Sequence, residues 1–178
     1  MSDTDEIITL VDRENRIVGD VSRRLMNFGR DIHRVTFILV FTGKDQLLLQ
    51  KRTETKAFCP GYYGVTTGGV VATGESYLEC AERELEEEIG VSLPLTSHGM
   101  FFTEGEGFRI WGKVFSCHYN PATHGPLSLQ AKEVAEVLNM SISDILNNTY
   151  NLPFTPDSYD ALLHYVRNEL KMSENDPI

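Results

Sequence analysis

Seven glutamates and a single arginine lie between Glu75 and Val91, so this segment carries a formal charge of −6 in a chain whose net charge is −10. Equal charges three or four residues apart on a helix repel one another by about 0.2–0.5 kcal/mol per pair. A bound divalent cation would remove that repulsion. Because the ligands on offer are hard carboxylate oxygens, they suit Mg²⁺ or Mn²⁺ and not Zn²⁺.

The apolar residues of the same segment recur with the period of an amphipathic helix. Thr73 and Gly74 offer a cap for its N-terminus, and Gly90 stands where a left-handed residue would end it. The stripe predicted to face the core consists of Leu78, Ala81, Leu85 and Ile89.

Three of the carboxylates share one edge of this helix, beside the apolar stripe. Glu84 and Glu88 are four residues apart, and Glu87 follows Glu84 by three. Carboxylates half buried beside a core have raised pKa values unless a cation neutralises them. We therefore expect these three to hold a metal ion; the alternative is an acidic surface helix without a ligand. The remaining helix glutamates are expected to face solvent: Glu79, Glu82 and Glu86.

The segment 69–91 resembles the Nudix box, Gly-x5-Glu-x7-Arg-Glu-U-x-Glu-Glu-x-Gly-U, in which U is aliphatic. Every defined position matches: Gly69, Glu75, Arg83, Glu84, Leu85, Glu87, Glu88, Gly90 and Val91. The resemblance implies a loop–helix–loop that holds Mg²⁺, or Mn²⁺, against the diphosphate of a small-molecule substrate. Such a protein is a hydrolase of the pyrophosphatase kind. It cleaves the diphosphate linkage that joins a nucleoside to another group, or the diphosphate linkage of a related small molecule.

By this match Glu84, Glu87 and Glu88 are the expected metal ligands, and the carbonyl oxygen of Gly69 is expected to contact the metal as well. Arg83 is expected to orient a carboxylate of the box. The proton of the attacking water would pass to a catalytic carboxylate, for which Glu84, Glu87 and Glu133 are the candidates.

Glu133 is a catalytic candidate because of its sequence context. The run Lys132-Glu133-Val134-Ala135-Glu136 resembles the Glu-Val-x-Glu sequence at the start of a late strand in the family. Glu136 is the second candidate at this place. The alternative is that both are ordinary acids of a surface loop.

Two cations precede the box, Arg52 and Lys56, and are candidates to bind the distal phosphate of the substrate. Their surroundings resemble the N-terminal half of isopentenyl-diphosphate isomerase, a Nudix-fold enzyme in which the matching residues hold a diphosphate. The Cys-x-His-Pro run of that enzyme is replaced here by residues 66–70, Thr-Thr-Gly-Gly-Val. The sequence therefore favours a hydrolase. The isomerase, and a non-catalytic module that binds nucleotide diphosphates, remain the alternatives.

Arg109 and Trp111 alternate with apolar residues in the predicted strand 108–118, so both point away from the face of Phe108 and Ile110. An arginine beside an indole can bind a base or a second phosphate of the substrate. The alternative is packing within a hairpin. The five histidines show no metal-ligand spacing.

The remaining elements predict an α/β protein with a mixed sheet, which fits the Nudix α/β/α sandwich. The last helix is expected to begin with Thr155 as its cap and Pro156 at its first position. The predicted strands are 6–11, 17–21, 34–42, 47–50, 62–67, 98–103, 108–118 and 134–140, with a short helix at 141–147. We expect one domain over residues 1–172 and a flexible tail over 173–178.

The composition excludes several classes of protein. A pI near 4.9 argues against a broad nucleic-acid surface, and no run of 18 apolar residues predicts a membrane span. The N-terminus is acidic, unlike a signal peptide. Three widely spaced cysteines without a CxxC pair favour reduced thiols and a cytoplasmic location. A small-molecule diphosphate is the expected partner, and the family resemblance adds the prospect of a homodimer.

Overall fold

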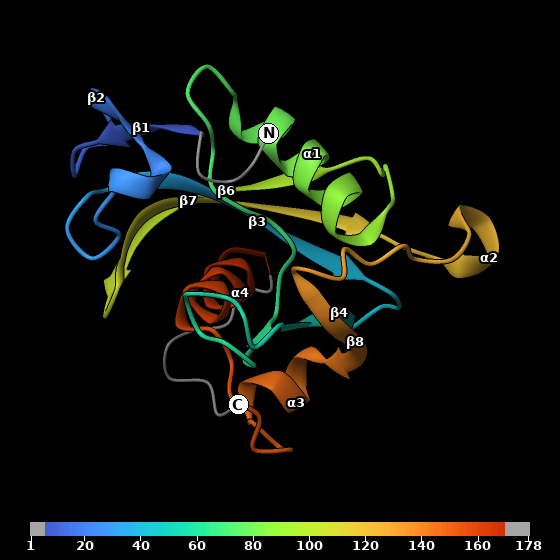
Figure 1. The fold of residues 1–178 in the computed structure, drawn as a ribbon. Helices are drawn as coiled ribbons and strands as arrows, with labels where there is room; N and C mark the ends of the chain where they lie inside the picture. The colour runs from blue at the N-terminus through green and yellow to red at the C-terminus, as the bar shows by residue number, and fades with distance from the viewer. Residues whose placement is uncertain (1–5, 170–178) are drawn as a thin grey trace.

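The structure is a computed structural model that describes residues 6–169. Its centre is a mixed sheet of eight strands with helices on both faces (Figure 1). The strands are β1 (Ile7–Val11), β2 (Ile17–Ser22), β3 (His33–Phe41), β4 (Gln46–Arg52), β5 (Tyr63–Gly64), β6 (Thr96–Gly105), β7 (Phe108–His118) and β8 (Val134–Ser141). The helices are η1 (Arg23–Leu25, a 3-10 turn), α1 (Tyr77–Ile89), α2 (Pro121–His124), α3 (Ile142–Leu146) and α4 (Pro156–Glu169).

Strand β3 organises the sheet. It runs parallel to β7 over its whole length and antiparallel to β1 and β4, while β6 continues the sheet beyond β7 and β8 pairs with β4. Successive side chains of a strand point to opposite faces. Phe37 and Leu39 therefore join one hydrophobic cluster with Leu162 of α4, and Ile38 and Val40 join a second with Leu85 of α1. This two-sided core confirms the predicted α/β/α sandwich.

Helix α1 ends as the sequence predicts, because Gly90 adopts the left-handed conformation with φ 73°. Its predicted start is wrong. The cap is Ser76, whose side chain accepts the N–H of Glu79 while the Glu79 carboxylate accepts the N–H of Ser76. This reciprocal capping box satisfies two backbone N–H donors at the start of the helix, those of Ser76 and Glu79.

The core-facing stripe of α1 also differs at one position. Leu85 and Ile89 are almost fully buried, and each contributes about 1.5–3 kcal/mol by leaving water. Leu78, by contrast, is 45% exposed, and Cys80 is buried in its place. The helix therefore turns its Cys80 side toward the loop that precedes it. Helix α4 begins at Pro156, as predicted, and buries Leu162 and Val166. The predicted tail over 173–178 lies outside the described residues.

The predicted strand 62–67 is much shorter in the structure, where β5 has two residues. Beyond it the chain pairs with β3 through isolated bridges at Thr67 and Val70. Gly68 separates these bridges with φ 143°, and a Cβ atom there would lie 2.1 Å from the carbonyl oxygen of Thr36. Only glycine allows the loop to approach β3 so closely. The loop is thereby fixed beneath α1. The sequence interpretation also missed α2 and η1.

Candidate metal and diphosphate site

The loop at Gly68 and Gly69 meets the acidic edge of α1. A Cβ atom on Gly69 would lie 2.4 Å from Oε1 of Glu84, so that carboxylate rests directly against the loop backbone. The N–H of Gly68 donates to Oε2 of Glu88 at 3.4 Å. Glu84 and Glu88, one helical turn apart, thus both face the loop.

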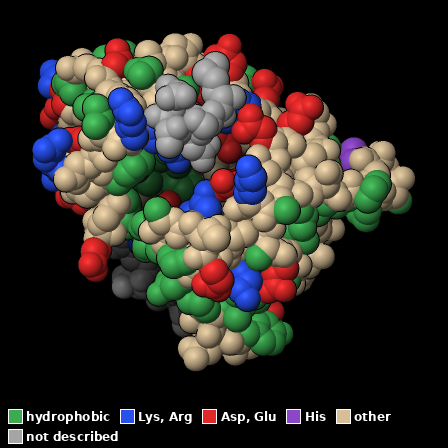
Figure 2. Space-filling view, in the orientation of Figure 1, with side chains coloured by type: hydrophobic (Ala, Val, Ile, Leu, Met, Phe, Trp, Pro, Cys, Tyr) green, Lys and Arg blue, Asp and Glu red, His purple; other side chains and the backbone are tan. Residues whose placement is uncertain are grey.

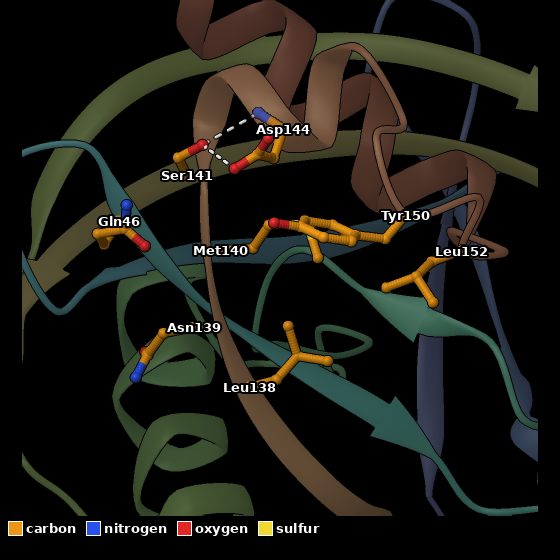
Figure 3. Close-up of a pocket in the computed structure, with 8 residues that line it drawn as sticks. All are labelled: Gln46, Leu138, Asn139, Met140, Ser141, Asp144, Tyr150 and Leu152. Carbon is orange, nitrogen blue, oxygen red and sulfur yellow. Dashed lines mark hydrogen bonds between the residues drawn. The ribbon is translucent and has the colours of Figure 1, made fainter.

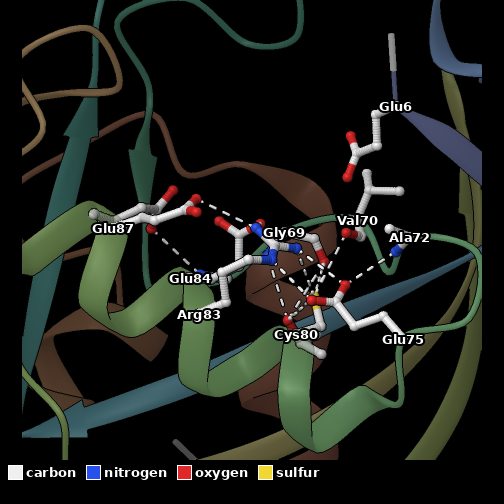
Figure 4. A network of polar contacts seen from close by, with 12 residues as sticks. Glu6, Gly69, Val70, Ala72, Glu75, Cys80, Arg83, Glu84 and Glu87 are labelled. Carbon is white, nitrogen blue, oxygen red and sulfur yellow. Dashed lines mark hydrogen bonds and ion pairs between the residues drawn. The ribbon is translucent and has the colours of Figure 1, made fainter. Parts of the chain in front are cut away.

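Arg83 is the centre of the polar contacts around this loop (Figure 4). Its guanidinium donates to Glu75 at 2.8 and 3.1 Å, to Glu84 at 2.8 Å and to Glu87 at 3.3 Å. The hydrogen bonds that Arg83 donates to Glu75, and then the charge of Glu84, raise the pKa of Arg83 above its usual value. Glu75 also accepts the N–H of Ala72 at 3.1 Å. The predicted orienting role of Arg83 agrees with these contacts.

The two inward carboxylates are costly to ionise. Burial raises the pKa of Glu84, although the charge of Arg83 opposes this. Burial, with the neighbouring charge of Glu84, raises the pKa of Glu88 to about 8. A cation placed between them would reverse both shifts. The site therefore has the electrostatic character of a cation site.

Glu133 and Lys56 lie near Glu88. They form an ion pair with each other, and both side chains are mostly buried. The charge of Glu133 raises the pKa of Glu88 and that of Lys56 lowers it, so both are within electrostatic range of the same carboxylate. The loop before β8 is tied to the helix end because the N–H of Gln130 donates to the carbonyl oxygen of Glu88 at 2.9 Å. Glu136 instead accepts the hydroxyl of Tyr63 at 2.7 Å.

Among the described residues, the guanidinium of Arg52 makes a hydrogen bond through only one of its three nitrogens. Its Nε donates to the carbonyl oxygen of Phe58 at 2.9 Å, and within residues 6–169 its two terminal nitrogens make no hydrogen bond or ion pair. Its charge also acts on Asp157, whose pKa is raised by burial. An arginine held by Nε alone retains both terminal donors for a ligand.

The predicted metal ligands do not all converge. The Glu87 side chain is 49% exposed and turns to Arg83. The Gly69 carbonyl oxygen accepts the N–H of Thr36 at 2.9 Å. In the described part of the chain, no three side chains of Asp, Glu, His or Cys lie close enough together to enclose a metal ion. Arg83 is instead the counter-cation of Glu84 and Glu87.

Arg109 and Trp111 lie on the face opposite Phe108 and Ile110, as the alternation predicts. Both have protein partners. Arg109 donates to Glu104 at 2.9 Å and to the carbonyl oxygen of Arg30, and the indole of Trp111 donates to the carbonyl oxygen of Asp12 at 3.2 Å. These contacts match the packing interpretation of the hairpin, and the ligand role stays a prediction.

Two residues near the site escaped the sequence interpretation. Thr36, fully buried on β3, contacts Gly69 through its backbone and its hydroxyl. Arg23 of η1 exerts an attractive charge on Glu84. Neither belongs to a motif, and both reach the site only through the pairing of distant segments.

The surface beside α1 is hollowed. Between the positions that α1 and α4 take in Figure 1, Figure 2 shows a hollow with hydrophobic side chains at its floor and both basic and acidic side chains on its border. A separate cavity of about 380 Å³ lies at the edge formed by β4, β8 and α3 (Figure 3). Its lining contains no residue of the box: Gln46, Leu138, Asn139, Met140, Ser141, Asp144, Tyr150 and Leu152. No helix among residues 6–169 is long and apolar enough to cross a membrane.

Comparisons with known proteins agree with this geometry. The NUDIX domain family model matches residues 31–162. The chain is 44% identical over 165 residues to an uncharacterized Nudix hydrolase of Yersinia pestis, covering 92% of this chain and 87% of that protein. It is 40% identical over 167 residues to the uncharacterized Nudix hydrolase YfcD of Escherichia coli strain K12, covering 93% and 89%.

Among solved structures, DR0079 of Deinococcus radiodurans matches with a TM-score of 0.74 at 19% identity, over 89% of this chain and 98% of that one. At that identity the likeness speaks for the fold. The matched range includes the complete box, the loop at Gly69 and the helix that carries Glu84 and Glu88. The chain therefore belongs to the Nudix hydrolases, the enzymes that act on diphosphate bonds.

Proposed function

We propose that the protein is a Mg²⁺-dependent hydrolase of the diphosphate linkage in a nucleoside diphosphate joined to another group, or in a related small molecule. The observation that carries this proposal is the pair of half-buried carboxylates, Glu84 and Glu88, that face the loop at Gly68 and Gly69 with raised pKa values. Their hard oxygens fit Mg²⁺, and Mn²⁺ as a substitute. A bound ion would neutralise phosphate charge and lower the pKa of a water molecule.

In this proposal the residues around the loop hold the ion, orient its ligands or bind phosphate. Glu84 and Glu88 would hold the ion, and Glu87, being exposed, is free to turn toward it from Arg83. Arg83 keeps Glu75 and Glu84 in place. The free terminal nitrogens of Arg52 match two oxygens of a phosphate, and Lys56 supplies a second positive charge nearby.

Glu133 is the carboxylate that we propose as proton acceptor for the attacking water, since it lies near Glu88 without belonging to the ion-holding edge. Glu133→Gln is expected to lower kcat by about 10²–10⁴-fold. The Mn²⁺ dissociation constant, measured by calorimetry, should change little. A tenfold or larger loss of Mn²⁺ affinity with kcat falling in parallel would instead make Glu133 a metal ligand.

Stability should depend on pH through Glu88. Its pKa is raised to about 8 in the folded protein, so the neutral form contributes stability that is complete below the unfolded value near 4.5 and is lost as pH rises through about 8. The Tm of the metal-free protein should therefore fall by about 5 °C or more between about pH 5 and pH 8.5. Saturating Mg²⁺ should restore most of this loss.

The matching control is Glu88→Gln, which removes the titrating group. That variant should show a much flatter dependence of Tm on pH in the absence of metal. An equally steep dependence in the variant would assign the effect to other groups.

One neighbour bears on the substrate class. The NUDIX domain of Shewanella oneidensis NrtR, with a TM-score of 0.58 at 19% identity, was solved in complex with ADP-ribose. A nucleoside diphosphate joined to a sugar is accordingly included in the proposed class.

Isopentenyl-diphosphate isomerase is the lesser candidate, because residues 66–70 of this chain lack the Cys-x-His-Pro run of that enzyme. The three cysteines are free thiols, in keeping with a cytoplasmic location. The homodimer stays a prediction.

The test is a screen for phosphate release or cleavage over nucleoside triphosphates, nucleotide sugars, dinucleoside polyphosphates, NADH, coenzyme A and prenyl diphosphates. Each compound is assayed with Mg²⁺, with Mn²⁺ and with EDTA. Metal-dependent cleavage at a diphosphate linkage is the expected result. Tight binding of a nucleotide without any product after long incubation would favour the non-catalytic module.

A further inference from the structure

Cys80 lies on the edge of α1 that faces the loop of the site. It precedes Glu84 by four residues and Glu88 by eight, so a thiol and two carboxylates follow one another along this edge at intervals of about one helical turn. The thiol donates to the carbonyl oxygen of Val70 at 3.5 Å, and its sulfur lies 3.7 Å from the carbonyl oxygen of Gly69 (Figure 4). The first of the three side chains therefore contacts the loop backbone directly.

Thr36 contacts the same stretch of loop from the side of the sheet. Its N–H donates to the carbonyl oxygen of Gly69 at 2.9 Å, and its hydroxyl oxygen lies 3.4 Å from that carbonyl oxygen and 3.4 Å from the sulfur of Cys80. Thr36 and Cys80 are both fully buried. The loop backbone is thus held between β3 and α1 by two buried side chains that also contact each other.

The hydroxyl and the thiol have one proton each, and these two protons suffice for the two loop carbonyls. When the Thr36 hydroxyl donates to Gly69 and the Cys80 thiol donates to Val70, the sulfur can still accept from Nη2 of Arg83, which lies 3.6 Å away. Val70 is buried, and within residues 6–169 no other donor reaches its carbonyl oxygen. Loss of the thiol would therefore leave a buried acceptor without a partner, which destabilises this position of the loop.

Packing alone does not account for Cys80. The two hydrophobic clusters of the core include Cys117 of β7 but not Cys80. Cys117 is almost as completely buried, and its thiol makes no hydrogen bond among the described residues. Cys80 is instead surrounded by a hydroxyl, two carbonyl groups and a guanidinium. The two buried cysteines therefore differ in their polar contacts and offer a matched comparison.

We propose that Cys80 is a positioning residue, which together with Thr36 fixes the loop backbone at Gly69 and Val70 against α1 and so sets the place of Glu84 relative to that loop. The Nudix box leaves the position of Cys80 undefined, within the seven residues between its first glutamate and its arginine. The inference rests on the proposed function, in which Glu84 holds the ion. Residues that orient the ligands of a metal typically change metal affinity or activity by about 10–100-fold when they are replaced.

The test compares Cys80→Ala with Cys117→Ala, the same change at two buried sites, at a temperature where both variants are folded. The Mn²⁺ dissociation constant is measured by calorimetry and kcat with a substrate found by the screen. Both variants should have a lower Tm, because each leaves a cavity. Cys80→Ala is expected to weaken Mn²⁺ binding and to lower kcat by about tenfold each, whereas Cys117→Ala should stay within about twofold of wild type in both.

Two further variants separate hydrogen bonding from size. Cys80→Ser keeps a donor at this place and should bind Mn²⁺ more tightly than Cys80→Ala. Thr36→Val removes the hydroxyl at nearly constant volume and should weaken Mn²⁺ binding as well. Because both side chains act on the same stretch of backbone, the double variant of Thr36→Val and Cys80→Ala should lose less affinity than the product of the two single losses.

Three outcomes would overturn the inference. Equal losses of Mn²⁺ affinity in Cys80→Ala and Cys117→Ala, or none in either, would make the role of Cys80 that of an ordinary core residue. A Cys80→Ser variant as weak as Cys80→Ala would mean that the sulfur acts by its size. Losses that multiply fully in the double variant would mean that Thr36 and Cys80 act independently.

Failure of the proposed function is recognised separately, because wild type would then bind no Mn²⁺ and cleave no diphosphate in the screen. Hydrogen exchange of the metal-free protein tests the positioning of the loop in either case. The amide of Gly69, which donates to the Thr36 hydroxyl at 3.4 Å, should exchange faster in Cys80→Ala than in Cys117→Ala. Equal exchange rates in the two variants would contradict a role of Cys80 in holding the loop.

Discussion

Glu88→Gln should lower metal-dependent turnover by about a hundredfold or more while raising the Tm of the metal-free protein. Turnover falls because the variant removes a negative oxygen from the site that would hold the ion, and one such contact contributes several kcal/mol to the transition state. The Tm rises because the carboxylate it replaces is costly to ionise, with a pKa of about 8 in the folded protein. Steady-state kinetics and thermal melts in EDTA measure the two effects.

The control for this variant is Glu86→Gln, which makes the same chemical change on the exposed side of α1. It should change neither turnover nor Tm appreciably. Retention of full Mg²⁺-dependent activity in Glu88→Gln would remove Glu88 from the proposed site. A parallel fall in Tm and activity would instead make its role structural.

Gly68→Ala is the second change with a large expected effect. Its φ of 143° is strained for any residue with a Cβ atom, and that atom would lie 2.1 Å from the carbonyl oxygen of Thr36. The loop would have to leave β3 and carry Gly69 away from Glu84. We expect the free energy of unfolding, measured in urea, to fall by about 3 kcal/mol or more, with most activity lost.

Gly74→Ala separates the cost of the strained φ from the cost of the steric clash with β3. Gly74 also has a positive φ, 84°, but a Cβ atom there would meet nothing within 4 Å. Its replacement should cost only the backbone strain, about 1–2 kcal/mol, and leave the site active. Equal costs for the two variants would mean that the close approach of the loop to β3 contributes little.

The sequence predicted the elements whose signals are local. Apolar periodicity identified most of the core side of α1, Gly90 marked the end of α1, and Pro156 marked the start of α4. The sequence also contained the correct start, Ser76 three residues before Glu79, but the interpretation favoured Thr73 and Gly74. Leu78 was assigned to the core because a period of 3.6 does not reveal how a helix is rotated against its sheet, and the structure buries Cys80 instead.

The site was predicted only in part, for a related physical reason. The box places Glu84 and Glu88 on one edge of a helix, and the structure brings both to the loop. The direction of the Glu87 side chain depends on Arg83, and the contact between Glu133 and Lys56 depends on the pairing of β4 with β8. Thr36 and Arg23 approach the loop only after the sheet has formed. Such long-range pairings carry no local sequence signal.

The most direct test of the central claim is ³¹P NMR of a turnover reaction in ¹⁸O-enriched water. With Mg²⁺ and a substrate found by the screen, we predict two phosphate-bearing products, one of which carries an oxygen from the solvent, and no products in EDTA. Conversion of isopentenyl diphosphate to dimethylallyl diphosphate with the diphosphate intact, or equal rates with and without metal, would contradict a metal-dependent hydrolase built on Glu84 and Glu88.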